Sequence, residues 1–299
     1  MFEILLLAVV IDVLFGEPPS PIHPVVLMGH VIARGRAWCE RRGNQLFWGL
    51  FLLIYTVGVI LLILEGVLML VHQVPSIVQV IFYACLLKMT ISIRFLHSAA
   101  MAVQSTVEEP DVEEARRAVG ELVSRDTGSL SEENIISAAC ESVAESLTDS
   151  IIAPLCWYLV LGLPGAFFYR AINTLDSMIG YEHLKLGTAS AKLDDVLNFI
   201  PARIGGGLIL VAGALLGHDV IHGLRILKRD RNTPQSPNAG YTMAPVAGLL
   251  RVRFEKEGYY TLGDLLRPLS PSLIQQTLSI VEGSVLIFLV CSSLLEVIM

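Results

Sequence analysis

The 299-residue sequence predicts an all-α, polytopic integral membrane protein with several transmembrane helices. Hydrophobic residues make up 54% of the chain and charged residues only 16%, whereas soluble domains usually contain about 45–50% and about 25%. The excess is concentrated in blocks, and residues 46–64, LFWGLFLLIYTVGVILLIL, contain no charged residue. Because about 20 apolar residues span a bilayer, this block predicts a transmembrane helix.

Further apolar blocks predict additional spans. Three more segments are long enough to cross a bilayer, although each is interrupted by one or two polar positions; they are roughly 77–98, 197–217 and 275–298. The opening MFEILLLAVVIDVLFG has neither a basic leading region nor a small-residue cleavage site. We therefore expect a retained, short membrane segment there instead of a signal peptide.

The apolar stretch 151–170 is interrupted at LGLPG, residues 161–165, and two interpretations are open. Each half has about eleven apolar residues or fewer, too few to cross a core of roughly 30 Å. Gly and Pro together are typical of a turn, so a re-entrant hairpin would return the chain to the side from which it entered. Such backbone is tolerated at membrane depth only when protein buries it or it lines a cavity. The alternative is a single kinked helix, and the sequence favours neither.

Basic residues predict the orientation of the chain. The loop 29–43 carries four arginines, and the positive-inside tendency places it in the cytoplasm; these are Arg34, Arg36, Arg41 and Arg42. The same tendency assigns the basic segment 225–231 to the cytoplasm. If 197–217 is a full crossing, however, the loops before and after it lie on opposite faces, and hydropathy leaves this point open.

We expect one membrane-embedded catalytic domain, residues 1–299, with a soluble helical insert at 101–149. In DVEEARRAVGELV, apolar residues recur at helical spacing behind an acidic first turn. A second helix is predicted to open at Ser129, with Glu132 completing a capping box. A tight turn at RDTG, residues 125–128, would join the two amphipathic helices.

Composition also excludes several classes of function. The five cysteines contain no C-x-x-C pair, which argues against a zinc site and a disulfide framework. Small buried hydrophobic residues are the better interpretation of these cysteines. The net charge of −7, with no basic stripe, gives no indication of nucleic-acid binding.

The second predicted helix carries an acidic ladder, which we define as Glu141, Glu145 and Asp149. These residues recur every four positions and share one helix face without an intervening Lys or Arg, although like charges at this spacing repel each other. A solvated acidic face is one interpretation. The other is a site for a hard divalent cation such as Mg²⁺, because carboxylates in a segment that runs into a membrane are costly and tend to be functional.

A second polar group lies in NTLDSMIGYEHLKLGTASAKLDDVLNFIPAR, residues 173–203, between two apolar stretches. A helix places Asn173, Asp176 and Ser177 on one face. Further along are carboxylates, a lysine, an amide and an arginine, namely Lys192, Asp194, Asp195, Asn198 and Arg203. Carboxylates for a metal beside cations for a phosphate are typical of phosphoryl chemistry. The sequence contains no G-x-x-x-x-G-K-[ST] motif, so a nucleotide would be held in another way.

Taken with other motifs, this segment resembles the adenosylcobinamide-phosphate synthase family (CobD/CbiB) of cobalamin biosynthesis. The resemblance runs nearly end to end. It includes D-x-x-x-GEP at 12–18, HPV at 23–25, RDT at 125–127, E-S-V-A-E-x-x-x-D at 141–149, G-x-x-SAKLDDVLNFIPAR at 187–203 and DRNTPQSPNAG at 230–240. The sequence departs from the family pattern at Ser124, Ser146 and Pro234, where the family usually has Gly, Asn and His. The last departure removes a candidate base from the 230–240 loop.

The resemblance implies a multi-pass protein of the cell inner membrane that uses ATP and Mg²⁺. It would join a carboxylate of adenosylcobyric acid to (R)-1-amino-2-propanol phosphate, or to a related phosphorylated amino alcohol or threonine phosphate. The catalytic face would be cytoplasmic. Expected partners are these substrates, membrane lipid and no nucleic acid, with association with other cobalamin-assembly enzymes or a homo-oligomer as further expectations.

Site roles follow from the same resemblance. We expect catalytic roles for Lys192, Asp194, Asp195 and Arg203, with one of the two aspartates taking the proton of the attacking ammonium. Metal ligands are expected among Glu141, Glu145, Asp149 and Asp176. ATP, phosphate or corrinoid binding is expected of Arg125, Asn173, Ser177, Asn198, Arg229, Ser236 and Asn238.

Two other functions compete with this interpretation. A transporter also places charges and broken helices in the membrane, but here the polar groups cluster in loops and no inverted repeat is visible. A non-catalytic membrane regulator of the same superfamily is the second, because a shared fold does not secure activity.

Overall fold

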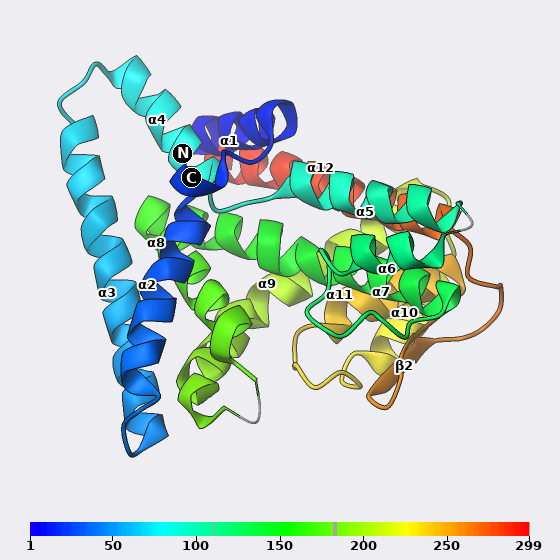
Figure 1. Ribbon diagram of the computed structural model, residues 1–299. Coiled ribbons are helices and arrows are strands. Elements are labelled where there is room, and N and C mark those ends of the chain that lie inside the picture. The colour runs from blue at the N-terminus through cyan, green and yellow to red at the C-terminus, as the bar shows by residue number, and fades with distance from the viewer. Residues whose placement is uncertain (110, 182–183, 299) are drawn as a thin grey trace. The chain divides into compact units, whose positions relative to one another are not determined.

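The computed structural model describes residues 1–109, 111–181 and 184–298. The chain divides into two compact units, and each is described by itself. Unit 1 comprises Met1–Ile93 and Ala153–Asn198, and unit 2 comprises Arg94–Ile152 and Phe199–Met299. The chain therefore passes between the units three times, and the last passage lies within a helix. The predicted all-α membrane architecture is confirmed (Figure 1).

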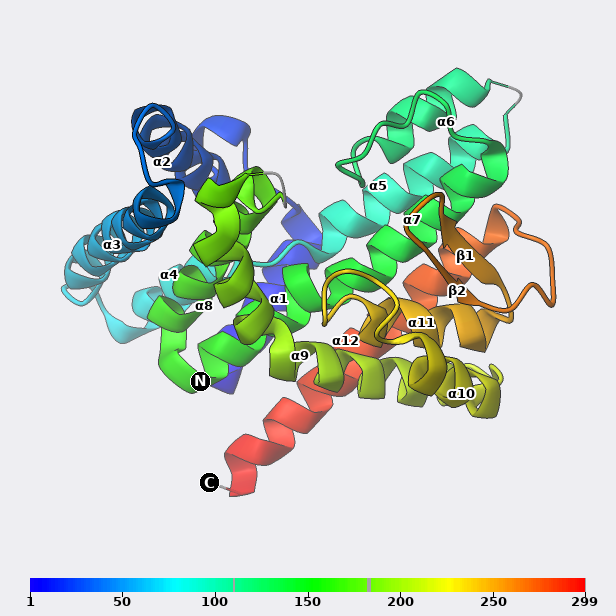
Figure 2. The same ribbon diagram turned by 90° about the horizontal axis from the view of Figure 1, so that it is seen from below.

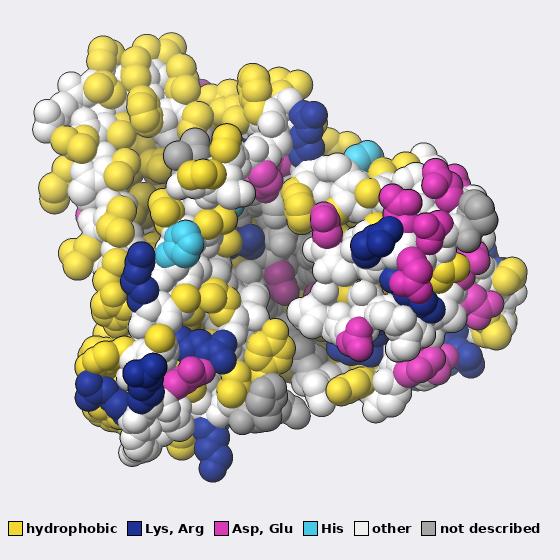
Figure 3. Space-filling model, in the orientation of Figure 1, with side chains coloured by type: hydrophobic (Ala, Val, Ile, Leu, Met, Phe, Trp, Pro, Cys, Tyr) yellow, Lys and Arg dark blue, Asp and Glu magenta, His cyan; other side chains and the backbone are white. Residues whose placement is uncertain are grey.

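Five helical segments are long and apolar enough to cross a membrane. They are Gln45–Val71, Ser76–Val107, Glu132–Ile179, Lys185–Leu215 and Ser272–Leu294. Many large apolar side chains on these segments are exposed, for example Leu62 at 74% and Leu70 at 68%. Hydrophobic side chains cover much of the surface of the α3 region in Figure 3. Such a surface is suited to lipid, because a soluble protein rarely exposes so large an apolar area.

In the described residues of unit 1, every regular element is a helix or a helical turn. Its elements are α1 (Phe2–Phe15), the 3₁₀ turn η1 (Ser20–Ile22), α2 (Pro24–Cys39), α3 (Gln45–Val71), α4 (Ser76–Lys88), α8 (Ala153–Ile179), η3 (Lys185–Gly187) and the first part of α9 (Thr188–Leu215). Helix α2 begins well because Pro24 occupies its first turn and the His23 ring accepts a hydrogen bond from the Val25 amide. Helices α2, α3 and α8 enclose a core that contains Ile32, Leu52 and Leu175.

The chain reverses within α8, and this decides between the two interpretations of residues 151–170. Gly162 has φ +67° and ψ −157°, a conformation that favours glycine. A side chain at Gly165 would lie 2.3 Å from the Trp157 carbonyl oxygen, and Ala153 shares a core with Tyr169. In a straight helix those last two residues would be about 24 Å apart. Figure 2 shows the resulting bend, so residues 151–170 form a hairpin of two short helices and not the single kinked helix of the alternative interpretation.

A charge network is buried near the start of unit 1. The Lys88 ammonium lies 2.7 Å from Glu17 Oε2 and 3.5 Å from Asp12 Oδ1. The His23 Nε2 atom lies 2.9 Å from the same Glu17 oxygen, while Asp12 Oδ2 accepts a hydrogen bond from the Ile93 amide. Asp12 is fully buried and Lys88 is 4% exposed. We call these four side chains, Asp12, Glu17, His23 and Lys88, the Lys88 network.

Unit 2 is built around a buried central helix. It contains α5 (Ile93–Val107, of which only Ile93 belongs to unit 1), α6 (Val112–Val119), α7 (Glu132–Leu147), the π-helical turn η2 (Thr148–Ile152), the rest of α9, α10 (Val220–Asp230), α11 (Gly240–Leu250), β1 (Arg253–Lys256), β2 (Tyr260–Gly263) and α12 (Ser272–Ile298). Helix α7 contacts α6, α11, α12 and β1. Ten of its 16 residues are buried, so it forms the core of unit 2.

One local prediction for unit 2 was wrong, and one element was missed. The cap of α7 is Ser131, whose hydroxyl accepts from the Asn134 amide at 3.3 Å. Glu132 is the first helical residue and not the third, so a capping box from Ser129 cannot form. The sequence reasoning also missed the antiparallel hairpin of β1 and β2, in which Arg253 pairs with Gly263 and Lys256 pairs with Tyr260.

Cysteine environments match the prediction only in part. Cys39 and Cys140 are buried, Cys85 and Cys156 are half-buried, and Cys291 is exposed. Cys291 lies on α12, one of the candidate membrane spans. A small apolar side chain on such a surface does not need burial in protein, because lipid replaces the core.

Candidate functional site

In unit 1 the polar residues of α8 and the start of α9 come together. We call Asn173, Asp176, Asp194, Asp195 and Asn198 the α8–α9 cluster. Helical spacing explains the grouping, since each helix contributes side chains that lie one turn apart. Asp194 is only 8% exposed and the charges of Asp176 and Asp195 both act on it. Three carboxylates thus lie near one another within this unit.

The amides of the α8–α9 cluster hold Asp194 in one orientation. Asn198 Nδ2 donates to Asp194 Oδ2 at 2.9 Å, and Asn173 Nδ2 donates to Asp194 Oδ1 at 3.3 Å. The hydroxyl of Tyr169 donates to Asn198 Oδ1 at 2.9 Å, which fixes the amide in turn. Because amides neutralise no charge, the carboxylate is oriented while its negative charge stays available for a cation or a proton.

Asp176 is placed by close packing at the end of α8. A side chain at Gly180 would lie 1.8 Å from an Asp176 carboxylate oxygen, so glycine is required there. Ser177 donates back to the Asn173 carbonyl oxygen at 2.9 Å and is exposed. Lys192 is also exposed, two residues before Asp194. Among the described residues, neither of these last two side chains forms a hydrogen bond or an ion pair with Asp194.

In unit 2, Glu141 lines a small pocket together with residues that the sequence reasoning did not connect with it. The pocket has a volume of about 120 Å³. Its lining residues are Leu122, Val123, Ser124, Arg125, Ala138, Glu141, Ser142, Glu145, Lys256 and Tyr260. We call it the Glu141 pocket. Both charge signs are present, from α7, from the loop before it and from the β-hairpin.

Both carboxylate oxygens of Glu141 accept hydrogen bonds. The Ser137 hydroxyl donates to Oε1 at 2.7 Å and the Tyr260 hydroxyl donates to Oε2 at 2.7 Å. Burial raises the pKa of the Tyr260 phenol well above its usual range, and the Glu141 charge adds to the effect. The phenol therefore remains a hydrogen-bond donor, and Glu141 has a fixed orientation.

The acidic ladder does not continue evenly to Asp149. The α-helix ends at Leu147, and Asp149 lies in the π-helical turn η2. A π turn contains more residues than an α turn, so four-residue spacing no longer keeps the side chain on the same face. Glu141 and Glu145 line the pocket, and Asp149 is not among its lining residues.

A second cationic group in unit 2 surrounds Arg203. Its guanidinium lies 3.4 Å from the ring centre of Phe199 and 4.2 Å from that of Tyr241. It also donates to Asn238 Oδ1 at 3.3 Å, and the backbone N–H of Asn238 donates to the Ser236 hydroxyl at 3.3 Å. Stacking holds the guanidinium plane without neutralising its charge, which suits recognition of phosphate.

Arg229 has a different environment. It donates to both oxygens of Asp230, at 2.6 and 2.8 Å, and to Asp264 at 2.8 Å. Burial alone would raise the pKa of Asp230, but these hydrogen bonds outweigh it and hold that pKa below the ordinary value. Such a guanidinium stabilises the fold of the hairpin region, and we leave Arg229 out of the proposed site.

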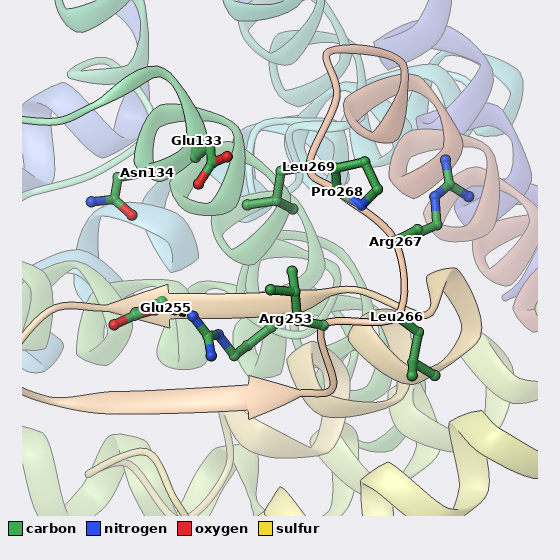
Figure 4. Close-up of a pocket in the computed structure, with 9 residues that line it drawn as sticks. Glu133, Asn134, Arg253, Glu255, Leu266, Arg267, Pro268 and Leu269 are labelled. Atoms are coloured by element: carbon green, nitrogen blue, oxygen red, sulfur yellow. Dashed lines mark ion pairs between the residues drawn. The ribbon is translucent and has the colours of Figure 1, made fainter.

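A larger pocket of about 360 Å³ in unit 2 contains no residue of the predicted site. Figure 4 shows its lining, in which Arg253 and Glu255 project from the hairpin. These two side chains form an ion pair at 3.1 Å. The charges of this pocket are thus at least partly satisfied by the protein itself.

The arrangement of carboxylates limits how a metal ion could be held. Among the residues that the structure describes, no three His, Cys, Asp or Glu side chains converge as a metal site. Mg²⁺ often binds through only one or two protein carboxylates together with substrate phosphates. The oxygen donors of the α8–α9 cluster fit an Mg²⁺ ion that arrives with a nucleotide, and not a metal held by protein ligands alone.

The structure thus brings together some expected site residues and separates others. Unit 1 contains the α8–α9 cluster, and unit 2 contains the Glu141 pocket and the Arg203 group. Tyr169, Lys256 and Tyr260 were missed by sequence reasoning. Tyr169 lies four residues before Asn173 in the same helix, so its place beside the cluster could have been predicted from helical spacing. Lys256 and Tyr260, by contrast, come near α7 because of the β-hairpin, which the sequence did not indicate.

Comparison with known proteins places the chain in a family. The family described as CobD/Cbib protein matches residues 5–281. A cobalamin biosynthesis protein CobD of Dehalococcoides mccartyi is 40% identical over 293 residues, covering 97% of this chain and 95% of that protein. A probable cobalamin biosynthesis protein CobD of Methanothermobacter thermautotrophicus is 45% identical over 266 residues, covering 88% and 86%.

A third relative, a probable cobalamin biosynthesis protein CobD of Methanocaldococcus jannaschii, is 38% identical over 303 residues and covers 98% of this chain and 97% of its own. No solved structure matches the chain. The matches extend over both units, so they concern the whole fold and not one motif. The chain belongs to the CobD/CbiB family of cobalamin biosynthesis proteins.

Proposed function

We propose that this protein is an ATP- and Mg²⁺-dependent amide ligase. It joins a carboxylate of adenosylcobyric acid to (R)-1-amino-2-propanol phosphate, or to a related phosphorylated amino alcohol or threonine phosphate, and yields adenosylcobinamide phosphate or its analogue. Family membership supports a role in cobalamin biosynthesis and a corrinoid substrate. The identity of the reaction rests on the chemistry of the site residues.

The observation that carries the proposal is the environment of Asp194. This buried carboxylate is oriented by two amides and lies near two further carboxylates. A negative charge held in place without a neutralising partner can take a proton from the amine nitrogen as that nitrogen attacks, or can bind the cation of Mg-ATP. The Tyr169–Asn198 hydrogen bond fixes this geometry before any substrate arrives.

The reaction requires two balanced steps. The substrate carboxylate attacks the γ-phosphorus of ATP, giving an acyl phosphate and ADP. The amine nitrogen then attacks the acyl carbon, the C–O bond to phosphate breaks, and an amide, inorganic phosphate and a proton are released. Asp194 or Asp195 takes that proton, and a Mg²⁺ ion bound with ATP would supply neutralisation of the phosphate charge.

Cationic residues of unit 2 are proposed to bind phosphate groups. Arg203 presents a guanidinium that is stacked on two rings and, among the described residues, donates only to neutral oxygens. Arg125 lies at the Glu141 pocket. Guanidinium groups bind phosphate bidentately, which fixes both position and orientation. Asn238, whose side-chain oxygen accepts from Arg203, keeps that guanidinium in its plane.

We also propose that the catalytic face is cytoplasmic in a cell inner membrane, because ATP is present there. Cysteines introduced singly at residues 126, 192 and 232, in a variant without the five native cysteines, should react with a membrane-impermeant maleimide only after the membrane is opened. Labelling of any of the three from the periplasmic side of intact cells would contradict this orientation.

The direct test uses the purified full-length protein in detergent with adenosylcobyric acid, Mg-ATP and each of the three phosphorylated amines in turn. One amide per ADP is expected, with the product identified by its mass. Asp194→Asn serves as the inactive control. No ADP-coupled amide with any of the amines, from a folded preparation, would overturn the proposed function.

A further inference from the structure

The Glu141 pocket contains two cations and two carboxylates that do not pair with one another. Within the described part of the chain, no ion pair within 4.0 Å joins Arg125, Glu141, Glu145 or Lys256 to any partner, although each of the four lines the pocket. Elsewhere in the same hairpin, Arg253 pairs with Glu255 at 3.1 Å. Opposite charges that face one small cavity without closing on each other leave room for a ligand that complements both.

The anionic side of the pocket is oriented by the protein. Glu141 is held by Ser137 and Tyr260. The Ser137 hydroxyl also accepts a hydrogen bond from the Glu255 amide at 2.8 Å, so the hairpin is fastened to α7 at the pocket. Glu145 lies one turn further along α7 and interacts with the charge of Lys256. The two carboxylates therefore keep a fixed separation along one helix face.

The cationic side of the pocket has unused hydrogen-bonding capacity. Arg125 Nε is buried and has no hydrogen-bond partner among the described residues. A buried N–H without a partner is costly, and an acceptor on a bound ligand would remove this cost. The Lys256 ammonium lies 5.1 Å from the ring centre of Tyr259, a contact that leaves its three N–H donors free for an anion.

The size of the pocket limits the ligand. A volume of about 120 Å³ corresponds to roughly four water molecules at about 30 Å³ each. Pockets for drug-sized molecules and cofactors have volumes of about 300–1,000 Å³, so this pocket can enclose neither a whole nucleotide nor a corrinoid. A Mg²⁺ ion bound to Glu141 and Glu145 would meet two flanking cations, which disfavour it electrostatically.

We propose that the Glu141 pocket binds a small zwitterion with a phosphate at one end and an ammonium group at the other. Arg125 and Lys256 bind the phosphate, Glu145 binds the ammonium group, and Tyr260 positions Glu141 beside it. The inference rests on the proposed function only for the identity of this zwitterion as the phosphorylated amino alcohol substrate. It assigns a ligand contact to Lys256 and a positioning role to Tyr260, and it makes the glutamates ammonium ligands instead of metal ligands.

The test measures binding to the full-length protein in detergent by titration calorimetry, with EDTA present and without ATP or corrinoid. The probe is O-phosphoethanolamine, and ethanolamine and inorganic phosphate are the single-charge comparisons. We expect the zwitterion to bind at least tenfold more tightly than either. Lys256→Met and Glu145→Gln should each weaken its binding at least tenfold, whereas Arg253→Met, a matched control in the same hairpin, should bind as the wild type does.

Lys256→Arg keeps the charge and should retain binding within about threefold. Wild-type affinity in both Lys256→Met and Glu145→Gln would overturn the proposal, as would equal losses in Lys256→Met and Lys256→Arg. Binding that appears only when Mg²⁺ replaces EDTA, and that Glu145→Gln removes, would show a metal site instead. Because the assay needs no turnover, a wild type that binds the probe but forms no amide would contradict the proposed function and not the pocket.

Discussion

The Lys88 network of unit 1 and the Glu141 pocket of unit 2 contain similar side chains in opposite arrangements. In the network, one ammonium lies 2.7 Å from Glu17 and 3.5 Å from Asp12, and Asp12 is fully buried. In the pocket, two cations and two carboxylates line a cavity without a direct ion pair among the described residues. In both groups the burial of charged side chains costs free energy, and this cost is largest within a membrane.

The comparison separates charges that hold the fold from charges that are available to a ligand. Where opposite charges contact each other directly, the protein itself compensates the loss of hydration, and removal of one partner takes away part of that compensation from a charge that stays buried. Where they face a cavity, a substituted side chain removes ligand contacts and leaves the packing almost unchanged. Substitution in the Lys88 network should therefore mainly lower stability, whereas substitution in the Glu141 pocket should mainly weaken ligand binding.

The largest expected effect is on stability, at Lys88. Lys88→Met should lower the free energy of unfolding by roughly 3–5 kcal/mol, because Asp12 and Glu17 would both lose the ammonium that lies between them while Asp12 stays buried. Unfolding by SDS in dodecyl maltoside micelles, followed by tryptophan fluorescence, measures this loss. Lys256→Met should change the same quantity by less than about 0.5 kcal/mol. Equal losses in the two variants would remove the distinction between the two places.

The second effect concerns Asp194 and Asp195, which are adjacent but differently placed. Asp194→Asn puts a third amide against Asn173 and Asn198, so we expect kcat to fall about 10²-fold or more, as for loss of a proton-transfer group. Asp195 is half-buried and should orient a cation, so Asp195→Asn should raise KM for ATP more than it lowers kcat.

Both constants should be measured for the two aspartate variants across a Mg²⁺ titration. Loss of the same parameter by the same factor, with the same Mg²⁺ dependence, would refute the division of roles. Full activity of both variants would show that the α8–α9 cluster is not where the reaction takes place.

A smaller effect is expected at Tyr260, which acts through Glu141. Tyr260→Phe removes one hydrogen bond, a loss on the order of 1 kcal/mol. The affinity for O-phosphoethanolamine should fall roughly fivefold, while the weak binding of inorganic phosphate should not change, because phosphate is bound at the other end. A proportional loss for both probes would indicate a general disturbance of the hairpin and no positioning of Glu141.

Much of the fold could be predicted because long apolar blocks have few structural alternatives. The block 46–64 became α3, and the predicted spans near 77–98, 197–217 and 275–298 all overlap helices. The reversal at Gly162 could not be decided, since Gly and Pro suit both a kink and a turn. Packing of Gly165 against Trp157 determined it, and such a contact has no signature in a local window.

The site was predictable only where helical spacing defines it. Asn173 with Asp176, and Glu141 with Glu145, lie on shared helix faces as their spacing indicates. Asp149 left that face because a π turn follows Leu147, and nothing in the local composition signals one. Lys256 and Tyr260 reach α7 through a short hairpin, a long-range contact that periodicity does not reveal.

The smallest expected effect is a pH dependence in the Lys88 network. Burial alone would raise the pKa of Glu17, but hydrogen bonds from His23 and Lys88 and their charges outweigh it and hold that pKa below the ordinary value of 4.5. A carboxyl whose pKa is lowered by folding stabilises the folded state above its unfolded pKa, and this contribution disappears as pH falls through the folded pKa.

Glu17→Gln should therefore lower Tm at pH 7, although by less than Lys88→Met does, because a glutamine oxygen still accepts hydrogen bonds from the same donors. The difference in Tm between wild type and variant should stay constant from pH 7 to about pH 5 and shrink below pH 4.5. Asp12 and His23 are present in both proteins, so their own titration largely cancels in the difference. Scanning fluorimetry across this pH range measures the difference. If it persists unchanged to pH 3, the Glu17 charge does not stabilise the Lys88 network, and the hydrogen bonds of Glu17 alone account for its contribution.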